Sequence, residues 1–216
     1  MIITVGNTKG GVGKTTVATN LAIHHANAGG DVLLVDGDEQ GSAATFTELR
    51  ASGRPDRNPG YTCVRLEGAA LRTQVRALTP KYDTIIIDVG GQNTGSLRAA
   101  LTVSHAVLIP VQPRTLDVWA TDQIVELVGE ARAVNPELRA LAFVNLADPQ
   151  GLAGKDNRDT LAALRDTAGI EALDAMLVRR KSFANAIAAG LGVTEQVGRD
   201  RDARAVEELL ALVAAV

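Results

Sequence analysis

Residues 2–16 read IITVGNTKGGVGKTT, in which a short apolar run leads through a glycine-rich turn into a stretch with helical character. The β-branched residues at its start favour a strand. Gly10, Gly11 and Gly13 allow positive φ angles and let backbone N–H groups come close to a ligand. Where such a turn opens a helix, these N–H groups and the helix N-terminus form a site for an anion. The segment therefore predicts a strand, an anion-binding loop and a helix in succession.

The same alternation of strand and helix patterns continues along the chain. Several apolar runs are almost wholly aliphatic, which is typical of parallel strands buried on both faces. We therefore expect an α/β fold over residues 1–216, a single domain with a doubly wound, mainly parallel sheet flanked by helices. The predicted strands are Ile2–Val5, Val32–Val35, Tyr61–Leu66, Thr84–Ile87, Ala106–Val111, Leu141–Val144 and Ala175–Val178. The predicted helices are Thr15–Ala28, Ser42–Arg50, Ala69–Leu78, Gly95–Ser104, Leu116–Val134, Asp156–Ala168, Ser182–Ala189 and Ala203–Ala214.

Composition narrows the class of protein. The 216 residues are 46% hydrophobic and 22% charged, as in ordinary globular proteins, and the net charge of −3 gives no global positive field. A single cysteine excludes an internal disulfide and a thiolate metal cluster. No apolar run approaches the ~18 residues that span a membrane, and the N-terminus lacks the pattern of a signal peptide. We therefore expect a cytoplasmic protein.

The loop from Lys9 to Thr16 predicts a triphosphate site. Lys14 supplies a mobile cation for the β- and γ-phosphates, and Thr15 places a hydroxyl where Mg²⁺ would sit. The common spacing Gly-x-x-x-x-Gly-Lys-Thr would require glycine at position 8, where this chain has threonine, and Lys9 adds a second lysine to the loop. The expected ligand-binding residues of the loop are Lys9, Gly10, Gly11, Val12, Gly13, Lys14, Thr15 and Thr16.

From Asn7 to Thr16 the chain resembles the deviant Walker A loop of the ParA/MinD superfamily, whose pattern is Asn-x-Lys-Gly-Gly-Val-Gly-Lys-Thr-Thr. The resemblance implies the P-loop NTPase fold and Mg²⁺-dependent hydrolysis of ATP to ADP and phosphate, with ATP and Mg²⁺ as cofactors. In relatives the first lysine reaches across a nucleotide-sandwich dimer to the partner's phosphates. The resemblance thus implies that Lys9 and Lys14 are both catalytic, and that Lys9 makes dimerisation depend on ATP.

Two aliphatic strands end in carboxylates, one in Asp36 and Asp38 and the other in Asp88. A carboxylate at the C-terminal end of a parallel strand faces the ligand crevice. The resemblance implies that Asp38 positions the attacking water. It also implies that Asp36 and Asp88 join Thr15 around Mg²⁺, the aspartates through water. The family writes this first motif Asp-x-Asp-Pro-Gln, whereas here Glu39 replaces the proline that would stiffen the loop.

Asn145 follows a later predicted strand, at a position that resembles the family's adenine-contacting asparagine. A side-chain amide both donates and accepts hydrogen bonds, as pairing with the adenine edge requires. The alternative is an asparagine that caps a turn.

Basic residues gather in the C-terminal part. Arg179, Arg180 and Lys181 precede a predicted helix, and relatives that ride on the chromosome bind DNA through basic residues in this region. Such contact with phosphates needs clustered cations and no reading motif. Contact with the nucleotide pocket is the alternative for these three. A second cluster in residues 199–204 is interleaved with acids, which is typical of a solvated face.

By this resemblance we expect a nucleoid-associated, ParA-like ATPase. It would dimerise on ATP, bind DNA non-specifically and drive plasmid or chromosome segregation, with a ParB-like partner stimulating hydrolysis. The chain opens at the first strand, so we expect no N-terminal helix-turn-helix domain. One alternative is a MinD-like or cargo-positioning ATPase on a membrane or cell-envelope machinery, although the last helix lacks the basic flanks of a membrane-binding helix. Another is a metabolic P-loop ligase, which would not require Lys9.

Overall fold

The structure is a computed structural model that describes residues 1–91, 94–113, 118–150 and 153–216. These ranges contain a seven-stranded sheet in the order β3-β2-β4-β1-β5-β6-β7, with parallel pairing throughout. The predicted doubly wound parallel sheet is therefore confirmed. The strands are β1 (Ile2–Val5), β2 (Val32–Asp36), β3 (Thr62–Arg65), β4 (Thr84–Asp88), β5 (Ala106–Val111), β6 (Arg139–Ala147) and β7 (Glu171–Val178).

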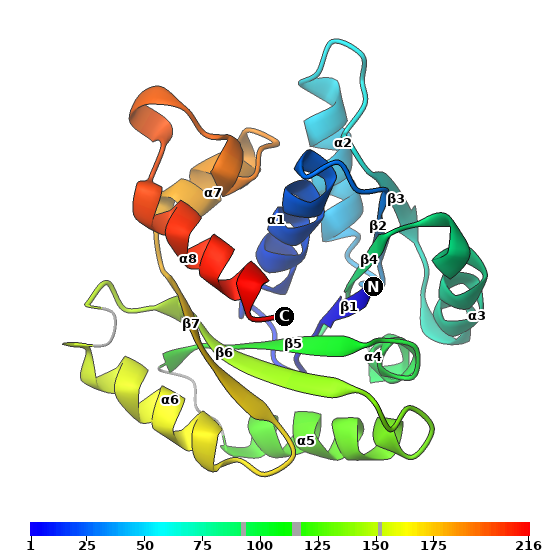
Figure 1. Ribbon diagram of the computed structural model, residues 1–216, viewed down its shortest axis with the longest axis vertical. Helices are drawn as coiled ribbons and strands as arrows, with labels where there is room; N and C mark the ends of the chain where they lie inside the picture. Colours follow the sequence, from blue (N-terminus) through cyan, green and yellow to red (C-terminus); the bar gives the residue numbers. More distant parts are fainter. Residues whose placement is uncertain (92–93, 114–117, 151–152) are drawn as a thin grey trace.

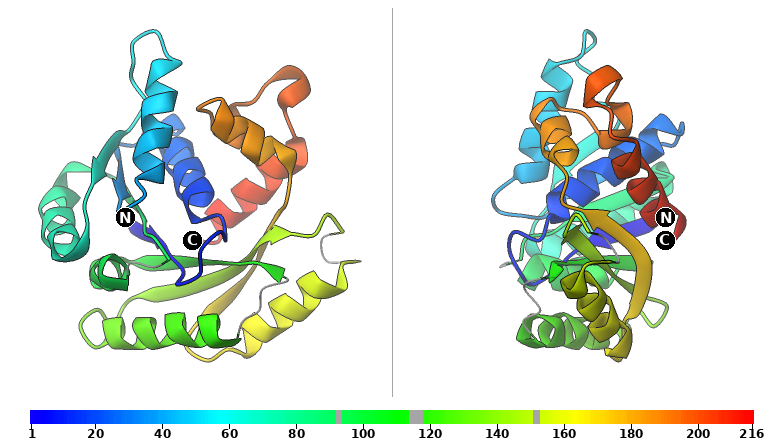
Figure 2. Two further views of the ribbon diagram at one scale, coloured as in Figure 1. Left: turned by 180° about the vertical axis from the view of Figure 1, so that it is seen from behind. Right: turned by 90° about the vertical axis from the view of Figure 1, so that its left-hand side faces the viewer.

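Helices cover both faces of the sheet (Figures 1 and 2). One layer consists of α1 (Lys14–Asn27), α2 (Ser42–Ser52), α7 (Lys181–Ala188) and α8 (Ala203–Ala214). The other layer consists of α3 (Gly68–Leu78), α4 (Thr94–Leu101), α5 (Val118–Arg132) and α6 (Lys155–Asp166). The predicted first residues of α5, from Leu116, lie outside the described residues. Short 3-10 helices at η1 (Thr79–Lys81), η4 (Val193–Glu195) and η5 (Gly198–Asp200) were not predicted.

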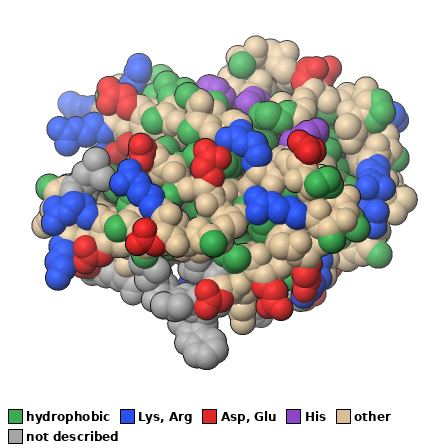
Figure 3. Space-filling view, turned by 60° about the horizontal axis from the view of Figure 1, so that its bottom comes forward, with side chains coloured by type: hydrophobic (Ala, Val, Ile, Leu, Met, Phe, Trp, Pro, Cys, Tyr) green, Lys and Arg blue, Asp and Glu red, His purple; other side chains and the backbone are tan. Residues whose placement is uncertain are grey.

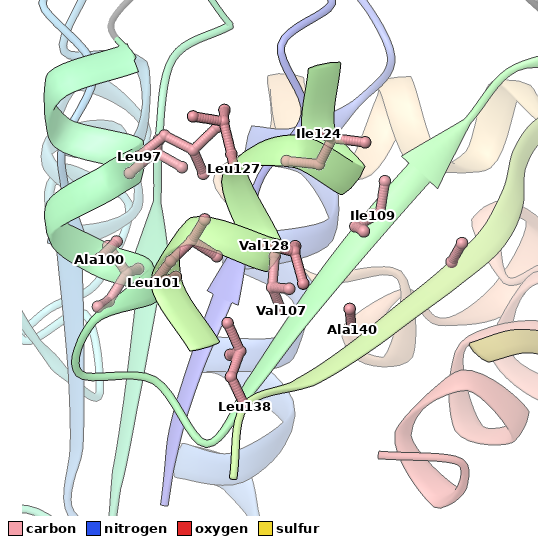
Figure 4. Close-up of a cluster of buried hydrophobic side chains, with 14 of the residues drawn as sticks. Leu97, Ala100, Leu101, Val107, Ile109, Ile124, Leu127, Val128, Leu138 and Ala140 are labelled. Atoms are coloured by element: carbon pink, nitrogen blue, oxygen red, sulfur yellow. The ribbon is translucent and has the colours of Figure 1, made fainter. Parts of the chain in front are cut away.

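Each central strand feeds two cores because successive side chains point to opposite faces. In β2, Leu33 packs into the core beneath α3 to α6, whereas Leu34 packs into the core beneath α1, α2, α7 and α8. Figure 4 shows the first of these cores, where Leu101 of α4 and Val128 of α5 converge on Val107 of β5. A strand buried on both sides must be apolar throughout, which is why the aliphatic runs predicted these strands well.

The two strands at one edge of the sheet are longer than predicted. β7 carries exposed Glu171 and Asp174, so its outer half lacks the apolar run of a central strand. The pairing of β6 with β7 shifts register between Asn145 and Ala147, and Leu146 has a φ of 53°. Such an irregularity bends a strand and redirects its side chains. It lies at the end of β6 that approaches the glycine loop.

The last helix is a packing element. Three residues of α8, Ala205, Leu209 and Leu212, are fully buried in the core between this helix layer and the sheet. Leu210 is 43% exposed. Among the described residues, no helix combines the length and the apolar content that crossing a bilayer would require.

A buried ion pair joins α2 to the segment that follows α7. The Arg50 guanidinium forms two bonds to the Glu195 carboxylate, of 2.6 and 2.7 Å, and also donates to the carbonyls of Pro59 and Gly190. Glu195 accepts a further bond from the backbone N–H of Gly192. Burial acts to raise the pKa of Glu195, but the bonds from Arg50 and Gly192 outweigh it and lower that pKa to about 2. Both charged groups of this pair, the Arg50 guanidinium and the Glu195 carboxylate, therefore have hydrogen-bond partners within the protein.

Candidate active site

The loop between β1 and α1 borders an open cavity of about 750 Å³. Gly11 and Gly13 have φ angles of 73° and 85°, so the predicted need for glycine is met at both positions. Gly13 is the N-cap of α1 and offers no capping side chain, so the first N–H groups of the helix are available to an anion. The cavity is lined by Gly10, Gly11, Gly13, Lys14, Thr15, Thr16, Asp38, Glu39, Gln40, Ser42 and Gly91.

Lys14 folds back over the loop. Its Nζ donates to the carbonyl oxygen of Lys9 at 2.7 Å, and the residue is 7% exposed. Burial lowers the pKa of this ammonium, while the carboxylates of Asp88 and Asp38 act to raise it. A carbonyl is a weaker partner for a cation than a phosphate, because only the phosphate is charged. Lys14 is therefore placed to turn toward an anion in the cavity.

Asp88 ends β4 and is 1% exposed. Neither of its carboxylate oxygens has a hydrogen-bond partner among the described residues. Burial raises the pKa of Asp88 to about 7; the Thr15 hydroxyl lies near enough to oppose this, although it forms no bond of normal geometry. Buried oxygens without partners are rare and mark a place for water or an ion. Asp88 and Thr15 therefore fit a hydrated Mg²⁺.

The described residues hold no group of three His, Cys, Asp or Glu side chains arranged around a metal. This also suits Mg²⁺, which is usually held by one or two carboxylates together with waters and ligand phosphates. Asp36 has other partners: its Oδ1 accepts the N–H of Asp38 at 3.1 Å, and its Oδ2 accepts the N–H of Ala44 at 2.8 Å. It thus holds the acidic loop and the start of α2, and its role at the metal stays a prediction.

Asp38 borders the cavity beside the end of β4. A Cβ atom on Gly90 would lie 2.8 Å from the carboxylate carbon of Asp38, and one on Gly91 would lie 2.9 Å from the backbone of Lys9. The backbone contact at Gly91 leaves no room for a Cβ atom, and one at Gly90 would displace the Asp38 carboxylate, so the turn after β4 packs directly against the acidic loop and the phosphate loop. The structure thus brings Asp38, Asp88 and Lys14 together, as the sequence predicted.

Lys9 is half-buried, and its backbone is held at both ends. Its N–H donates to Asn7 Oδ1 at 3.1 Å, and its carbonyl accepts the bond from Lys14. Asn7 in turn donates to the carbonyl of Pro110 at 2.9 Å, which ties the loop to β5. That the Lys9 side chain reaches a partner subunit stays a prediction.

Two further amides contact the loop from outside. Gln112, just after β5, donates to the carbonyl of Gly11 at 2.7 Å, and Asn145 donates to the carbonyl of Val12 at 2.6 Å. Neither Asn7 nor Gln112 was predicted from the sequence to contact the site. The sequence could have indicated both, because each is a polar residue close to the C-terminal end of an apolar strand. Contact of Asn145 with a base stays a prediction.

A small apolar recess lies beside the loop and has a volume of about 30 Å³. That is roughly the volume of one water molecule, so a nucleobase would have to widen it. Arg180 lines this recess, in keeping with the alternative that it contacts the nucleotide pocket. The other lining residues are Gly13, Thr16, Val17, Asn20, Asn145, Leu146, Leu177, Val178, Phe183 and Leu209.

The basic triplet divides into two kinds of residue. Arg180 forms an ion pair with Glu208, with an Nη2–Oε1 distance of 2.6 Å, and is half-buried, whereas Arg179 and Lys181 are exposed. Equal roles for the three in DNA binding therefore do not fit the geometry, because the Arg180 guanidinium is already engaged. Elsewhere, acidic and basic side chains are interspersed on the face shown in Figure 3.

Comparison with known proteins gives three levels of similarity. A family model described as the CobQ/CobB/MinD/ParA nucleotide binding domain matches residues 3–193. Maintenance of carboxysome distribution protein A from Halothiobacillus neapolitanus is 28% identical over 202 residues, covering 93% of this chain and 90% of that protein. The chromosome-partitioning ATPase Soj from Thermus thermophilus is 32% identical over 167 residues, covering 66% and 67%. Cobyrinic acid a,c-diamide synthase from Mycobacterium smegmatis, with a bound ATP analogue and magnesium, matches with a TM-score of 0.68 and 25% identity, covering 88% and 90%.

Proposed function

Because the chain belongs to the CobQ/CobB/MinD/ParA nucleotide-binding family, we propose that it is a Mg²⁺-dependent ATP hydrolase of the ParA type. ATP drives dimerisation and non-specific binding to DNA, and hydrolysis stimulated by a ParB-like partner releases the dimer. The cycle segregates a plasmid or chromosome. The observation that carries the proposal is the proximity of a buried cation, Lys14, to the carboxylate of Asp88, whose oxygens have no hydrogen-bond partner among the described residues, beside the open cavity that Lys14 lines.

The residues divide the chemistry of phosphoryl transfer between them. Loop N–H groups and Lys14 bind the β- and γ-phosphate oxygens and stabilise the charge that develops there. Thr15 and Asp88 would hold Mg²⁺, which when bound would neutralise phosphate charge. Asp38, packed on Gly90, orients the attacking water. The Lys9 side chain contributes to the partner subunit's site.

A second candidate differs in the cargo. The carboxysome distribution protein aligns with 93% of this chain, a larger share than the 66% aligned with Soj. This supports a cargo that is a large protein assembly in place of a DNA molecule. A metabolic ligase is a third candidate because the diamide synthase shares the fold. A ligase would hydrolyse ATP efficiently only with a small acid and an amide donor present, so turnover of MgATP alone separates it from the first two.

Light scattering tests the nucleotide-dependent dimer. We expect a monomer with ADP and a dimer with a non-hydrolysable ATP analogue and Mg²⁺, and we expect Lys9→Ala to remain monomeric in both. Lys81→Ala is the matched control, because Lys81 is an exposed lysine in η1. Dimerisation of the Lys9 variant with the analogue would contradict the role of this lysine.

A mobility assay on random-sequence DNA tests the second step. We expect retention with ATP but not with ADP, and a steep loss of affinity with rising salt because counterions are released from phosphates. Arg179→Ala with Lys181→Ala should weaken retention and reduce the salt slope. Arg72→Ala with Arg76→Ala on α3 is the control, since both are exposed. Equal retention with ATP and ADP would count against a nucleotide-gated DNA binder.

A further inference from the structure

Two side-chain amides from the ends of adjacent strands hold successive carbonyl groups of the phosphate loop. Gln112 Nε2 lies 2.7 Å from the oxygen of Gly11, and Asn145 Nδ2 lies 2.6 Å from the oxygen of Val12. Only the NH₂ end of an amide can face a carbonyl oxygen, so the direction of both bonds is fixed by chemistry. Asn145 is 4% exposed, and neither amide borders the larger cavity. Both therefore contact the loop from outside that cavity.

The chain is shaped to deliver Asn145 to this position. Leu146 has a φ of 53°, and among the described residues only Arg57 shares a positive φ outside glycine. The register of β6 against β7 shifts here as well. A Cβ atom on Gly13 would lie 2.5 Å from Asn145 Nδ2, so the amide occupies the space that any other residue at position 13 would need. Local backbone strain that is tolerated beside a site is commonly part of that site's geometry.

Peptide geometry turns these two bonds into a statement about the ligand. In a planar trans peptide, the C=O of one residue and the N–H of the next point in opposite directions. A bond to the carbonyl of Gly11 therefore fixes the direction of the Val12 N–H. A bond to the carbonyl of Val12 fixes the Gly13 N–H in the same way. These N–H groups are the ones a phosphate-binding loop presents to its anion.

We propose that Gln112 and Asn145 form an amide clamp, which holds the phosphate loop in the conformation that binds a polyphosphate before any ligand arrives. Both are positioning residues, since they act through the loop backbone. The inference rests on the proposed function, because the clamp matters only if the loop binds phosphates. It assigns Asn145 to the phosphates, whereas the resemblance assigned it to the base.

Tripolyphosphate separates the two assignments because it has the phosphates of ATP but no base. The clamp predicts that Asn145→Asp weakens binding of Mg²⁺-tripolyphosphate and of MgATP by the same factor. The change keeps the shape of the side chain but removes the donor, places an oxygen against the carbonyl of Val12 and adds a negative charge that itself repels phosphates, so the neutral Gln112→Leu must weaken both ligands as well. Losing a buried hydrogen bond in this way should weaken both ligands about ten-fold or more in calorimetry. Gln112→Leu should weaken both ligands in parallel, by a smaller factor.

Asn135→Asp is the matched control. Asn135 also donates through its Nδ2 to backbone carbonyls, those of Leu101 and Ser104, but it follows α5 and lies outside the loop's surroundings. Any general loss of stability should therefore appear in this variant too, without a change in tripolyphosphate affinity.

Each result has one meaning. Parallel weakening of both ligands in the two clamp variants, with the control unchanged, supports the clamp. Weakening of MgATP alone in Asn145→Asp, with tripolyphosphate unaffected, overturns it in favour of a base contact. Unchanged binding of both ligands also overturns it. If the unmodified protein binds neither ligand, the proposed function itself fails, which the other outcomes do not imply.

Discussion

Two buried ion-pairing regions of this molecule differ in how fully their charges are satisfied. Around Glu195, the carboxylate accepts bonds from Arg50, from Arg54 and from the backbone of Gly192. Around Asp88, a more deeply buried carboxylate accepts no hydrogen bond from the described residues. Burial raises the pKa of Asp88 to about 7, whereas its partners lower the pKa of Glu195 to about 2.

The difference shows which region maintains the fold and which one awaits a ligand. A buried charge whose partners are all internal costs several kcal/mol when one partner is removed. A buried carboxylate without partners destabilises the protein until a cation or water supplies them. Perturbed groups of the second kind cluster at functional sites. The contrast leads to four predictions about how function and stability respond to substitutions or to pH in and around these regions.

The largest effect is expected at Lys14. Lys14→Ala removes the cation that stabilises charge on the β- and γ-phosphates, so MgATP turnover should fall by at least about 10²–10³-fold. Its Nζ bonds a neutral backbone carbonyl, that of Lys9, so the urea midpoint should change little. Lys81→Ala should alter neither measurement. If the Lys14 variant retained turnover within a factor of two, the region around Asp88 and Lys14 would not be the one that serves ATP turnover.

Arg50→Ala should show the opposite pattern. It leaves Glu195 buried without its main partner, which should lower the free energy of unfolding by about 3–5 kcal/mol in urea titrations. Turnover per folded molecule should stay near that of the unmodified protein, because Arg50 does not border the cavity. The exposed Arg72→Ala on α3 should cost less than about 0.5 kcal/mol. A loss of turnover as large as that of Lys14→Ala would contradict the assignment of Arg50 to stability alone.

The two carboxylates should also give opposite pH dependences. Native Asp88 keeps its proton up to about pH 7, whereas an unfolded aspartate releases it near 3.8, so stability should fall as pH rises between these values. At 1.36 kcal/mol per pKa unit the loss reaches at most about 4 kcal/mol without Mg²⁺ or nucleotide. Asp88→Asn should abolish this slope in thermal unfolding.

Glu195 provides the control for that experiment. Its pKa is lowered from the usual 4.5 to about 2, so its contribution is present above pH 4.5 and is lost as the pH falls toward 2. Glu195→Gln should therefore remove the acid limb alone and leave the slope between pH 4 and 7 intact. If Asp88→Asn left the slope between pH 4 and 7 unchanged, the Asp88 carboxylate of the unmodified protein would have to be hydrogen-bonded, for example to water, in solution.

The smallest effect compares two glycines of the loop. Gly13→Ala combines a φ of 85° with a Cβ atom 2.5 Å from Asn145, and should cost about 1–3 kcal/mol of stability together with phosphate affinity. At Gly10 a Cβ atom meets nothing within 4 Å, so Gly10→Ala should be tolerated. Equal effects of the two substitutions on tripolyphosphate affinity would show that crowding by Asn145 is unimportant.

The fold was largely predictable because its strands are buried on both faces. The aliphatic runs of β2 and β4 leave few alternatives once both sides of a strand must be apolar. The predicted strand bounds were too short where a strand is not buried on both faces. β7 forms one edge of the sheet, and exposed Glu171 and Asp174 lie in its first half, which therefore carries no apolar run.

The site was predictable in place but not in detail. Carboxylates at strand ends predicted that Asp38 and Asp88 face the ligand crevice; in the structure Asp38 borders the cavity, and both carboxylates act electrostatically on Lys14, while their roles stay predictions. Sequence could not show that both oxygens of Asp36 are bonded to backbone N–H groups, because that depends on how the following loop folds. Nor could it pair Arg50 with Glu195, since no local pattern links residues so far apart.

The central place of β1 in the sheet has a consequence for biosynthesis. Its neighbours are β4 and β5, which are made long after it. Translation at about 5–20 residues per second leaves this strand exposed for several seconds before either neighbour leaves the ribosome. The glycine turn that follows it gains its last amide contact only when Asn145 has been made. The contacts of this turn can therefore be completed only after about two-thirds of the chain has been made.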